Sequence, residues 1–378
     1  MKIGIICYPT FGGSGVVATE LGLELAKKGH EIHFISYQQP ARLTGLLPNV
    51  FFHQVQMSAG EYPLFLHQPY EWALTSKIVW VTENYQLDFL HVHYAIPHAS
   101  AAYMAREILR EKNIFLPFLT TLHGTDITLL GGLPMYKPMI EFTIRHSNAI
   151  SSVSESLKRD TYKNFSIEKN IEVIPNFINL ETYQNPKKCA RHQIGAVENE
   201  IIFVHISNFR PVKRVADVIE IFDRVQKEIP ARLVLAGDGP ERSAIENLVT
   251  EKNLLQKVRF LGNIDCVPSL LSLADIFILP SAQESFGLSA LEAMAAACPV
   301  ISSNAGGLKE VNIDGETGFL SPVGDIENMS KNALFLAKNP EILKEFKHKA
   351  RQRAEKFQVQ FILPKYENLY QHLMALKV

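Results

Sequence analysis

The sequence predicts an α/β protein with two doubly wound domains, each built on a parallel sheet. Short apolar runs alternate with amphipathic segments along the chain, which is the pattern of strand–helix–strand units joined by right-handed crossovers. These units fall into two sets, separated by a stretch with two prolines and few periodic apolar positions, residues 172–188. We therefore expect one domain over residues 1–185 and a second over residues 195–357.

The first set opens with KIGIICY (residues 2–8), a short apolar run typical of a buried parallel strand. A helix is predicted next, because Val17, Leu21 and Leu25 share one helical face and Gly29 follows two lysines, as at a helix C-terminus. The other strands that we expect in this set lie at residues 31–36, 88–93, 118–123 and 149–153.

The second set repeats this alternation after residue 195. Its predicted helices include residues 215–228, and its predicted strands lie at residues 201–207, 232–237, 258–262, 275–280 and 299–303. Near the C-terminus, Leu369, Leu373 and Leu376 have helical spacing. We expect a helix at residues 358–378 that packs back onto the first domain, because it is too short to form a domain itself.

The composition excludes several classes of protein. Hydrophobic residues make up 47% and charged residues 20%, as in ordinary globular proteins. The net charge of -1 gives no overall positive field that would attract nucleic acid. The four cysteines form no C-x-x-C pair, which argues against a zinc or redox site. The first residues lack the features of a signal peptide, and no apolar run reaches 18 residues. We expect a cytoplasmic protein without a membrane span.

Glycines and polar residues follow the predicted strands, where doubly wound sheets bind ligands. GGSG (residues 12–15) follows the first strand and opens a helix, so its backbone could approach an anion; a tight turn is the alternative. Its glycine spacing also resembles the dinucleotide-binding fingerprint of oxidoreductases. The acid expected about 20 residues later is missing, which argues against NAD.

Histidines gather after two strands of the first set. His91, His93 and His98 suggest a metal site, but no nearby acid completes a set of ligands, so packing and hydrogen bonding are favoured. Tyr94 stands at the end of the same strand. In TLHGTD, His123 ends the next strand and Thr125 follows it, and the alternative for this motif is a helix cap by Thr125 or Asp126.

The second set carries charged residues at two strand–helix junctions. SNFRPVKR places Arg210, Lys213 and Arg214 at a helix start, where cations oppose the macrodipole, so an anionic ligand is favoured over a solvated loop. In ESFGLSALE, Glu284 lies in a loop and Glu292 lies about one turn into the following helix. Two acids and a helix N-terminus suit the hydroxyl and diphosphate groups of one ligand.

Together these motifs resemble those of the retaining glycosyltransferases of family 4, which have the GT-B fold. The resemblance covers nearly the whole chain and depends on GGSG, HG at His123, VIPN, the basic turn at Lys213, GDGP and the Glu-x7-Glu spacing from Glu284 to Glu292. It implies two Rossmann-like domains facing a cleft, the first for an acceptor and the second for a nucleotide-sugar.

The resemblance also implies roles for matching positions. Glu292 matches the acid that binds the UDP ribose, Glu284 the acid that holds donor-sugar hydroxyls, Lys213 the cation on the diphosphate, and His123 the histidine beside the donor sugar and reaction centre. The other donor-binding candidates are Gly13, Ser14, Arg210, Ser285, Phe286, Gly287 and Leu288. The catalytic candidates are His123, Arg210, Lys213 and Glu284.

One position departs from the family pattern. Asn208 stands where the family usually has an arginine, five positions before Lys213. Arg210 either replaces that arginine on the diphosphate or binds an acceptor carboxylate, and the sequence leaves both open.

Within the family, residues 7–36, HYAIPH, TTLHGTDIT and SNFRPVKRV are most similar to the members that transfer N-acetylglucosamine from UDP to the hydroxyl of L-malate in bacillithiol biosynthesis. UDP-GlcNAc and L-malate are thus the expected substrates. The candidate acceptor-binding residues, each after a strand, are Ser14, Tyr94, Thr125, Asn208 and Arg210.

The sequence also bears on cofactors, alternative functions and oligomeric state. No D-x-D-like motif follows a strand, so no metal or other cofactor is expected. The alternatives are a lipid or polysaccharide acceptor, or a UDP-sugar 2-epimerase of the same fold. The sequence does not decide whether the chain forms a homo-oligomer.

Overall fold

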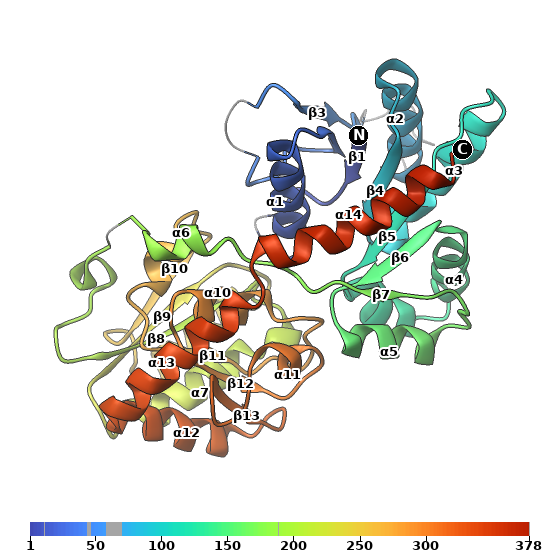
Figure 1. The fold of residues 1–378 in the computed structure, drawn as a ribbon. Helices are drawn as coiled ribbons and strands as arrows, with labels where there is room; N and C mark the ends of the chain where they lie inside the picture. The colour runs from blue at the N-terminus through green and yellow to red at the C-terminus, as the bar shows by residue number, and fades with distance from the viewer. Residues whose placement is uncertain (11, 44–46, 58–69, 188, 378) are drawn as a thin grey trace. The chain divides into compact units, whose positions relative to one another are not determined.

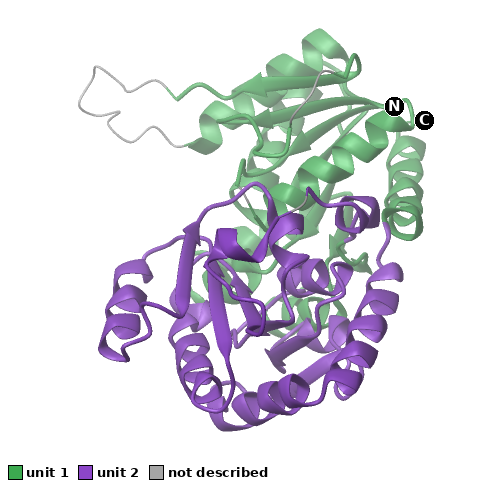
Figure 2. Ribbon diagram, turned by 90° about the vertical axis from the view of Figure 1, so that its left-hand side faces the viewer, with its two compact units in different colours: residues 1–176, 359–378 green, residues 177–358 purple. Residues whose placement is uncertain are grey.

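The computed structural model describes residues 1–10, 12–43, 47–57, 70–187 and 189–377. The chain divides into two compact units (Figure 2): unit 1 comprises Met1–Asn176 and Val359–Val378, and unit 2 comprises Phe177–Gln358. The division falls earlier than residue 185, the expected end of the first domain, because residues after 176 pack in unit 2. Tyr183, for example, is buried and donates its hydroxyl hydrogen to Glu292.

Unit 1 is built on a parallel sheet with the strand order β3-β2-β1-β4-β5-β6-β7 (Figure 1). The strands are β1 (Lys2–Ile6), β2 (Glu31–Ser36), β3 (Val50–Gln54), β4 (Phe89–His93), β5 (Phe118–Leu122), β6 (Ala149–Ser152) and β7 (Glu172–Val173). The order reverses between β1 and β4, which pair in parallel. This is the doubly wound topology that the sequence predicts, with its switch point beside β1.

The helices of unit 1 come from both ends of the chain. They are α1 (Ser14–Lys27), α2 (Tyr70–Tyr85), α3 (Ser100–Arg110), α4 (Lys137–His146), α5 (Glu155–Asn164) and α14 (Val359–Ala375), with short turns η2 (Ala95–Ala99), η3 (Thr125–Leu129) and η4 (Leu130–Gly132). Helix α14 packs against α1 and β5 and buries Tyr366 and Tyr370 completely. The last residue of the predicted C-terminal helix, Val378, lies outside the described residues.

Unit 2 repeats the topology with the strand order β10-β9-β8-β11-β12-β13, again all parallel. Its strands are β8 (Ile201–Ile206), β9 (Ala231–Ala236), β10 (Val258–Gly262), β11 (Ile276–Leu279), β12 (Val300–Ser303) and β13 (Gly318–Ser321). Its helices are α6 (Leu180–Gln184), α7 (Val215–Gln226), α8 (Arg242–Glu251), α9 (Val267–Leu271), α10 (Leu288–Ala295), α11 (Leu308–Val311), α12 (Ile326–Lys338) and α13 (Pro340–Glu355), with short turns η5 (Arg191–Ile194) and η6 (Pro211–Lys213). The switch point lies between β8 and β11.

The sequence located the central strands of both sheets but missed β3, β7 and β13. All three lie at a sheet edge. Few of their residues are fully buried, in contrast to the fully buried residues of β4 and β5. The stretch predicted as a linker, residues 172–188, contains β7 and α6 instead.

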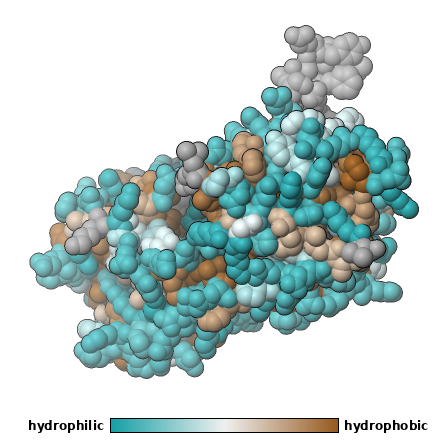
Figure 3. All heavy atoms as spheres, turned by 45° about the horizontal axis from the view of Figure 1, so that its top comes forward, coloured by the Kyte–Doolittle hydropathy of each residue, from teal (hydrophilic) through white to brown (hydrophobic). Residues whose placement is uncertain are grey.

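Hydrophilic residues dominate the face shown in Figure 3, with apolar ones scattered among them. Within the described ranges, no helix is both long and apolar enough to cross a membrane.

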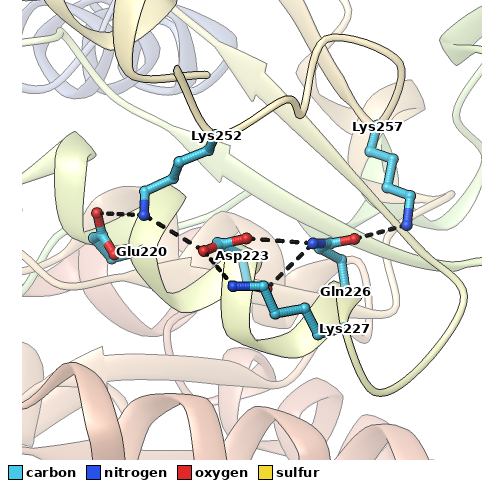
Figure 4. Close-up of polar contacts among 6 residues, drawn as sticks. All are labelled: Glu220, Asp223, Gln226, Lys227, Lys252 and Lys257. Carbon is cyan, nitrogen blue, oxygen red and sulfur yellow. Dashed lines mark hydrogen bonds and ion pairs between the residues drawn. The ribbon is translucent and has the colours of Figure 1, made fainter. Parts of the chain in front are cut away.

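In unit 2, Asp223 on α7 accepts hydrogen bonds from Lys227 at 2.9 Å and Lys252 at 3.4 Å, and this network extends to Glu220, Gln226 and Lys257 (Figure 4).

Candidate functional site

The polar motifs of each unit meet at its topological switch point. In unit 1, the loops after β1 and β4 are joined by a 2.8 Å hydrogen bond between Ser14 Oγ and Tyr94 Oη. In unit 2, Lys213 in η6, which follows β8, donates from Nζ to Glu284 Oε1, which follows β11, at 2.5 Å. Because a doubly wound sheet opens a crevice where its strand order reverses, these are the expected ligand positions.

The Lys213–Glu284 pair is largely enclosed. The two side chains are 21% and 10% exposed. Ser281 also donates to Glu284 Oε1, at 3.0 Å, and the backbone N–H of Ala282 donates to the carbonyl of Val212 at 2.8 Å, which ties the two loops together. An ammonium group has three donors, so Lys213 keeps hydrogen-bonding capacity for an anion while it is paired with Glu284.

Two glycines hold the backbone of the Glu284 loop. The backbone N–H of Gly307 donates to the Glu284 carbonyl at 2.9 Å. A Cβ at Gly306 would lie 2.0 Å from that carbonyl oxygen, and one at Gly307 would lie 2.4 Å from the carbonyl oxygen of Ser285. The glycine pair therefore packs under the Glu284 loop, where a side chain has no room.

Glu292 lies in α10, which begins directly after the same loop. Gly287 precedes the helix with a φ of 95°, and no side chain caps the helix N-terminus. Glu292 is 7% exposed and accepts a 3.1 Å hydrogen bond from the hydroxyl of Tyr183. Leu288 is the first helical residue, and Phe286 is buried edge-to-face against Phe357 at 5.7 Å. Glu284 thus lies in the loop and Glu292 in the helix, as predicted.

The basic turn after β8 separates into residues with different local roles. Arg214 has a φ of 51° and donates from Nε to Asp217 Oδ2 at 2.6 Å. Arg214 thus has a local partner in Asp217, as Lys213 has in Glu284. Arg210 and Asn208 are exposed, and no described residue forms an ion pair with the Arg210 guanidinium. Among the described residues, Arg210 is thus a cation of this turn with an exposed side chain and no ion-pair partner.

The GDGP turn packs closely against the backbone of this loop. A Cβ at Gly237 would lie 1.8 Å from the carbonyl oxygen of Ser207, and one at Gly239 would lie 2.7 Å from the nitrogen of Phe209. The Phe209 N–H donates to the carbonyl of Asp238 at 3.0 Å. The glycines therefore let two backbones approach closely, a requirement that the sequence alone did not reveal.

In unit 1, one buried carboxylate joins the loops that carry Tyr94 and His123. Asp126 is 1% exposed and accepts from the N–H of Ala95 at 2.7 Å and from the N–H of Gly124 at 3.3 Å. Burial raises the pKa of Asp126 to about 6, although these backbone donors oppose the shift. A helix cap was one alternative that the sequence left open for Asp126; in the structure Asp126 joins the segments that follow β4 and β5.

The candidate residues of the first domain follow β1, β4 and β5. Tyr94 has a φ of 83°, and its hydroxyl is hydrogen-bonded to Ser14 and interacts with Thr125, which is otherwise exposed. Gly13 has a φ of 62° and immediately precedes α1, and Ser14 is the first residue of that helix. Hydroxyl groups from three loops therefore meet at the switch point of unit 1.

The histidines of unit 1 form a hydrogen-bonded group. His93 Nδ1 lies 2.8 Å from His123 Nε2, and His98 donates from Nδ1 to the His93 carbonyl at 2.6 Å. His91 is hydrogen-bonded to the hydroxyls of Tyr370 and Thr121, both at 2.7 Å. The preference for packing and hydrogen bonding is confirmed for these side chains. Across the described residues, no three His, Cys, Asp or Glu side chains are grouped to hold a metal ion.

Burial keeps these imidazoles neutral at physiological pH. It lowers the pKa of His91 and of His123 to about 3 and that of His98 to about 4, and it lowers the pKa of His93 well below its ordinary value. His123 nevertheless is only partly buried as a residue. A ligand beside His123 would therefore meet a neutral hydrogen-bonding group.

Sequence reasoning missed several residues that hold the candidates in place. Ser281 could have been found, since it stands three positions before Glu284 in the same loop. Tyr183 lies 109 positions from Glu292, and His93 lies 30 positions from His123, so neither pairing has a local signal.

Comparison with known proteins relates the chain to sugar-transferring enzymes. Residues 11–182 match the family described as Glycosyltransferase Family 4, and residues 187–353 match Glycosyl transferases group 1. The chain is 43% identical over 372 residues to N-acetyl-alpha-D-glucosaminyl L-malate synthase of Bacillus anthracis, covering 98% of this chain and 96% of that protein.

Two solved structures share the fold at lower identity. Sucrose-phosphate synthase from Thermosynechococcus elongatus is 23% identical, with a TM-score of 0.81 and 99% of each chain covered. Anabaena HepE in complex with UDP and glucose is 20% identical, with a TM-score of 0.81, covering 98% of this chain and 100% of that one. Both similarities concern the architecture of two parallel-sheet, Rossmann-like units.

Proposed function

Since the chain belongs to glycosyltransferase family 4, we propose that it transfers N-acetylglucosamine from UDP-GlcNAc to the hydroxyl of L-malate, with retention of the anomeric configuration. This is the first step of bacillithiol biosynthesis. The observation that carries the proposal is the 43% identity, over 98% of this chain, to a protein named for that reaction. Both proposed substrates are cytoplasmic metabolites, so we propose a cytoplasmic location.

The donor assignment uses the charged groups at the switch point of unit 2. Negative charge develops on UDP as the glycosidic bond breaks, and preorganised donors stabilise it. Lys213 and Arg210 supply cations, and the N-terminus of α10 adds backbone N–H groups beside Ser285, Phe286, Gly287 and Leu288. Glu284 accepts from the sugar hydroxyls and Glu292 from the ribose. We propose that these groups act without a metal ion.

In unit 1, Gly13 and Ser14 line the phosphates and His123 contacts the transferred sugar. We assign no side chain as a nucleophile, and His123, with its pKa near 3, is a weak base at neutral pH. Front-face substitution accounts for retention: the bond from the anomeric carbon to the phosphate oxygen breaks, the bond to the malate oxygen forms, and the malate hydroxyl proton moves to the departing phosphate oxygen. A covalent sugar–protein adduct in the intact mass would contradict this route.

The acceptor carries two carboxylates and one hydroxyl. Arg210 is an exposed cation, and Ser14, Tyr94 and Thr125 provide hydroxyl groups that suit a small polyoxygenated acid. Asn208 adds an amide on the loop that carries Arg210. These five residues are the proposed acceptor-binding set.

The decisive test measures UDP release from UDP-GlcNAc with and without L-malate and determines the mass of the product. Succinate, which has both carboxylates but no hydroxyl, is the matched control and should give no glycosylated product. Malate-dependent UDP and a glycosyl-malate mass are expected, unchanged by EDTA. UDP binding without malate-stimulated turnover would discard the malate assignment and direct the search to lipid or polysaccharide acceptors. Light scattering of the same sample would distinguish a monomer from a homo-oligomer.

A further inference from the structure

We propose that His93 is a positioning residue for His123: its Nδ1–H donates to His123 Nε2 and fixes the tautomer in which His123 presents Nδ1–H to the substrate. The inference depends on the proposed function, which puts His123 beside the transferred sugar. His93 touches no substrate in this scheme and acts only through His123.

The geometry of the pair limits how its protons are arranged. The hydrogen bond between His93 Nδ1 and His123 Nε2 is 2.8 Å long. Two neutral imidazoles need one donor and one acceptor across that contact. Either His93 donates, and His123 carries its proton on Nδ1, or His123 donates, and His93 carries its proton on Nε2.

The other nitrogen of His93 distinguishes these arrangements. His93 is completely buried, and its Nε2 is a sealed atom with no hydrogen-bond partner in the structure. If His123 donated, His93 would hold an N–H group in this sealed position without an acceptor. Buried N–H groups without a partner are rarer than under-satisfied acceptors. The arrangement with a bare lone pair on His93 Nε2 is therefore favoured.

The neighbours hold His93 in this orientation. The His91 ring stacks on it with centroids 4.4 Å apart, and His91 is itself saturated by the hydroxyls of Tyr370 and Thr121. Tyr370 lies on α14, so the C-terminal helix supports this group. His98 donates to the His93 carbonyl at 2.6 Å. The histidines also disfavour each other's charged forms, in keeping with a neutral pair.

This tautomer has a chemical consequence for substrate recognition. The free position of His123 is then a donor, which suits a hydroxyl, carbonyl or phosphate oxygen that accepts a hydrogen bond. The opposite tautomer would present a lone pair and would require a donating hydroxyl. His93 thus determines which kind of oxygen group His123 recognises.

The first test is a long-range ¹H–¹⁵N correlation spectrum of the imidazoles in the ¹⁵N-labelled wild-type protein, with His123→Asn used to assign His123. We expect Nδ1 of His123 to be protonated and Nε2 to be unprotonated at neutral pH. A proton on His123 Nε2 would overturn the proposal. This measurement needs no acceptor, so it stands or fails separately from the malate assignment.

The second test compares two replacements of His93. His93→Asn keeps a side-chain N–H close to the Nδ1 position, and His93→Leu removes it. His93→Leu should lower kcat/KM for UDP-GlcNAc about 10–100-fold, by analogy with the loss of partners that orient metal-bound histidines, and His93→Asn should recover much of the loss. His93→Leu should also produce a mixture of His123 tautomers.

His53→Leu is the matched control. His53 belongs to another buried histidine pair of unit 1, joined to His33 Nδ1 by a 2.9 Å hydrogen bond to its Nε2. His53→Leu should leave the His123 tautomer and kcat/KM unchanged. If His93→Asn is as impaired as His93→Leu, or if His53→Leu causes the same kinetic loss, His93 has only a structural role. If His93→Leu does not fold, the wild-type spectrum still decides the tautomer.

Discussion

Replacing Gly306 by alanine should displace Glu284 without changing any charged group. Gly306 has a φ of 51°, and a Cβ there would lie 2.0 Å from the Glu284 carbonyl oxygen. Ordinary van der Waals contact begins at 3.4 Å, so the carbonyl must move away by about 1.4 Å. That movement also weakens the 2.9 Å hydrogen bond from Gly307 N–H to the same oxygen.

These distances give the expected size of the effect. A misplacement of about 1 Å in a catalytic group can cost roughly 10²-fold in rate, so kcat/KM for UDP-GlcNAc should fall about 100-fold. The left-handed backbone costs an alanine roughly 1–2 kcal/mol, and overpacking adds about 1–3 kcal/mol of lost stability.

Gly315→Ala separates these two contributions. Gly315 has a φ of 72°, but a Cβ there would meet no atom within 4 Å. This variant therefore bears the backbone cost alone. Steady-state UDP release and thermal unfolding should show near-normal kcat/KM for Gly315→Ala and a smaller loss of stability than for Gly306→Ala.

The comparison refutes the reasoning if the two variants behave alike. Equal kcat/KM values would mean that the loop absorbs the extra atom without moving Glu284. Equal losses of stability would mean that the close approach of Gly306 to the Glu284 carbonyl carries no energetic cost.

The remaining predictions concern one charge, one pH dependence and one ion-pair network. Lys213→Ala should lower kcat roughly 10²–10³-fold, as for a lost donor to developing charge, and near-normal turnover would exclude that role. The pKa of Asp126 is about 6 in the folded protein and 3.8 ordinarily, so the folded state binds more protons than the unfolded state between these pH values. The free energy of unfolding of the wild-type protein should therefore fall as pH rises through this range. Denaturant titrations of Asp126→Asn should show no such dependence of the unfolding free energy on pH. Asp223→Ala should lower the free energy of unfolding by about 1 kcal/mol in the same titrations, because it breaks the network of Figure 4. Glu327→Ala, which breaks an exposed pair with Lys331, should leave the melting temperature unchanged. Equal effects of the two replacements would contradict this prediction.

Local patterns were sufficient for the central elements of the fold. The apolar run at residues 2–8 and the helical spacing of Val17, Leu21 and Leu25 predicted β1 and α1 because both elements bury an apolar face. The strands β3, β7 and β13, which escaped prediction, lie at sheet edges and have few fully buried residues. The linker expectation failed at α6, whose Tyr183 is buried by contacts far along the chain.

In the candidate site, too, local patterns predicted single residues, whereas their contacts depend on the tertiary structure. Sequence reasoning found Lys213 and Glu284 separately, from their positions after strands. Their contact across 71 positions exists because the strand order brings β8 and β11 together. Arg214 shows the limit of such reasoning: an expected ligand-binding cation proved to be paired with Asp217.

The sequence by itself determined that this protein has two sets of α/β units, which loops carry polar residues, and to which family the chain belongs. These properties follow from local periodicity and short motifs. Only the tertiary structure decided that His93 meets His123, that Tyr183 meets Glu292, and that Gly306 lies under Glu284. The order of strands in a sheet sets these contacts, and residues far apart in the chain carry no local sign of which loops that order makes neighbours.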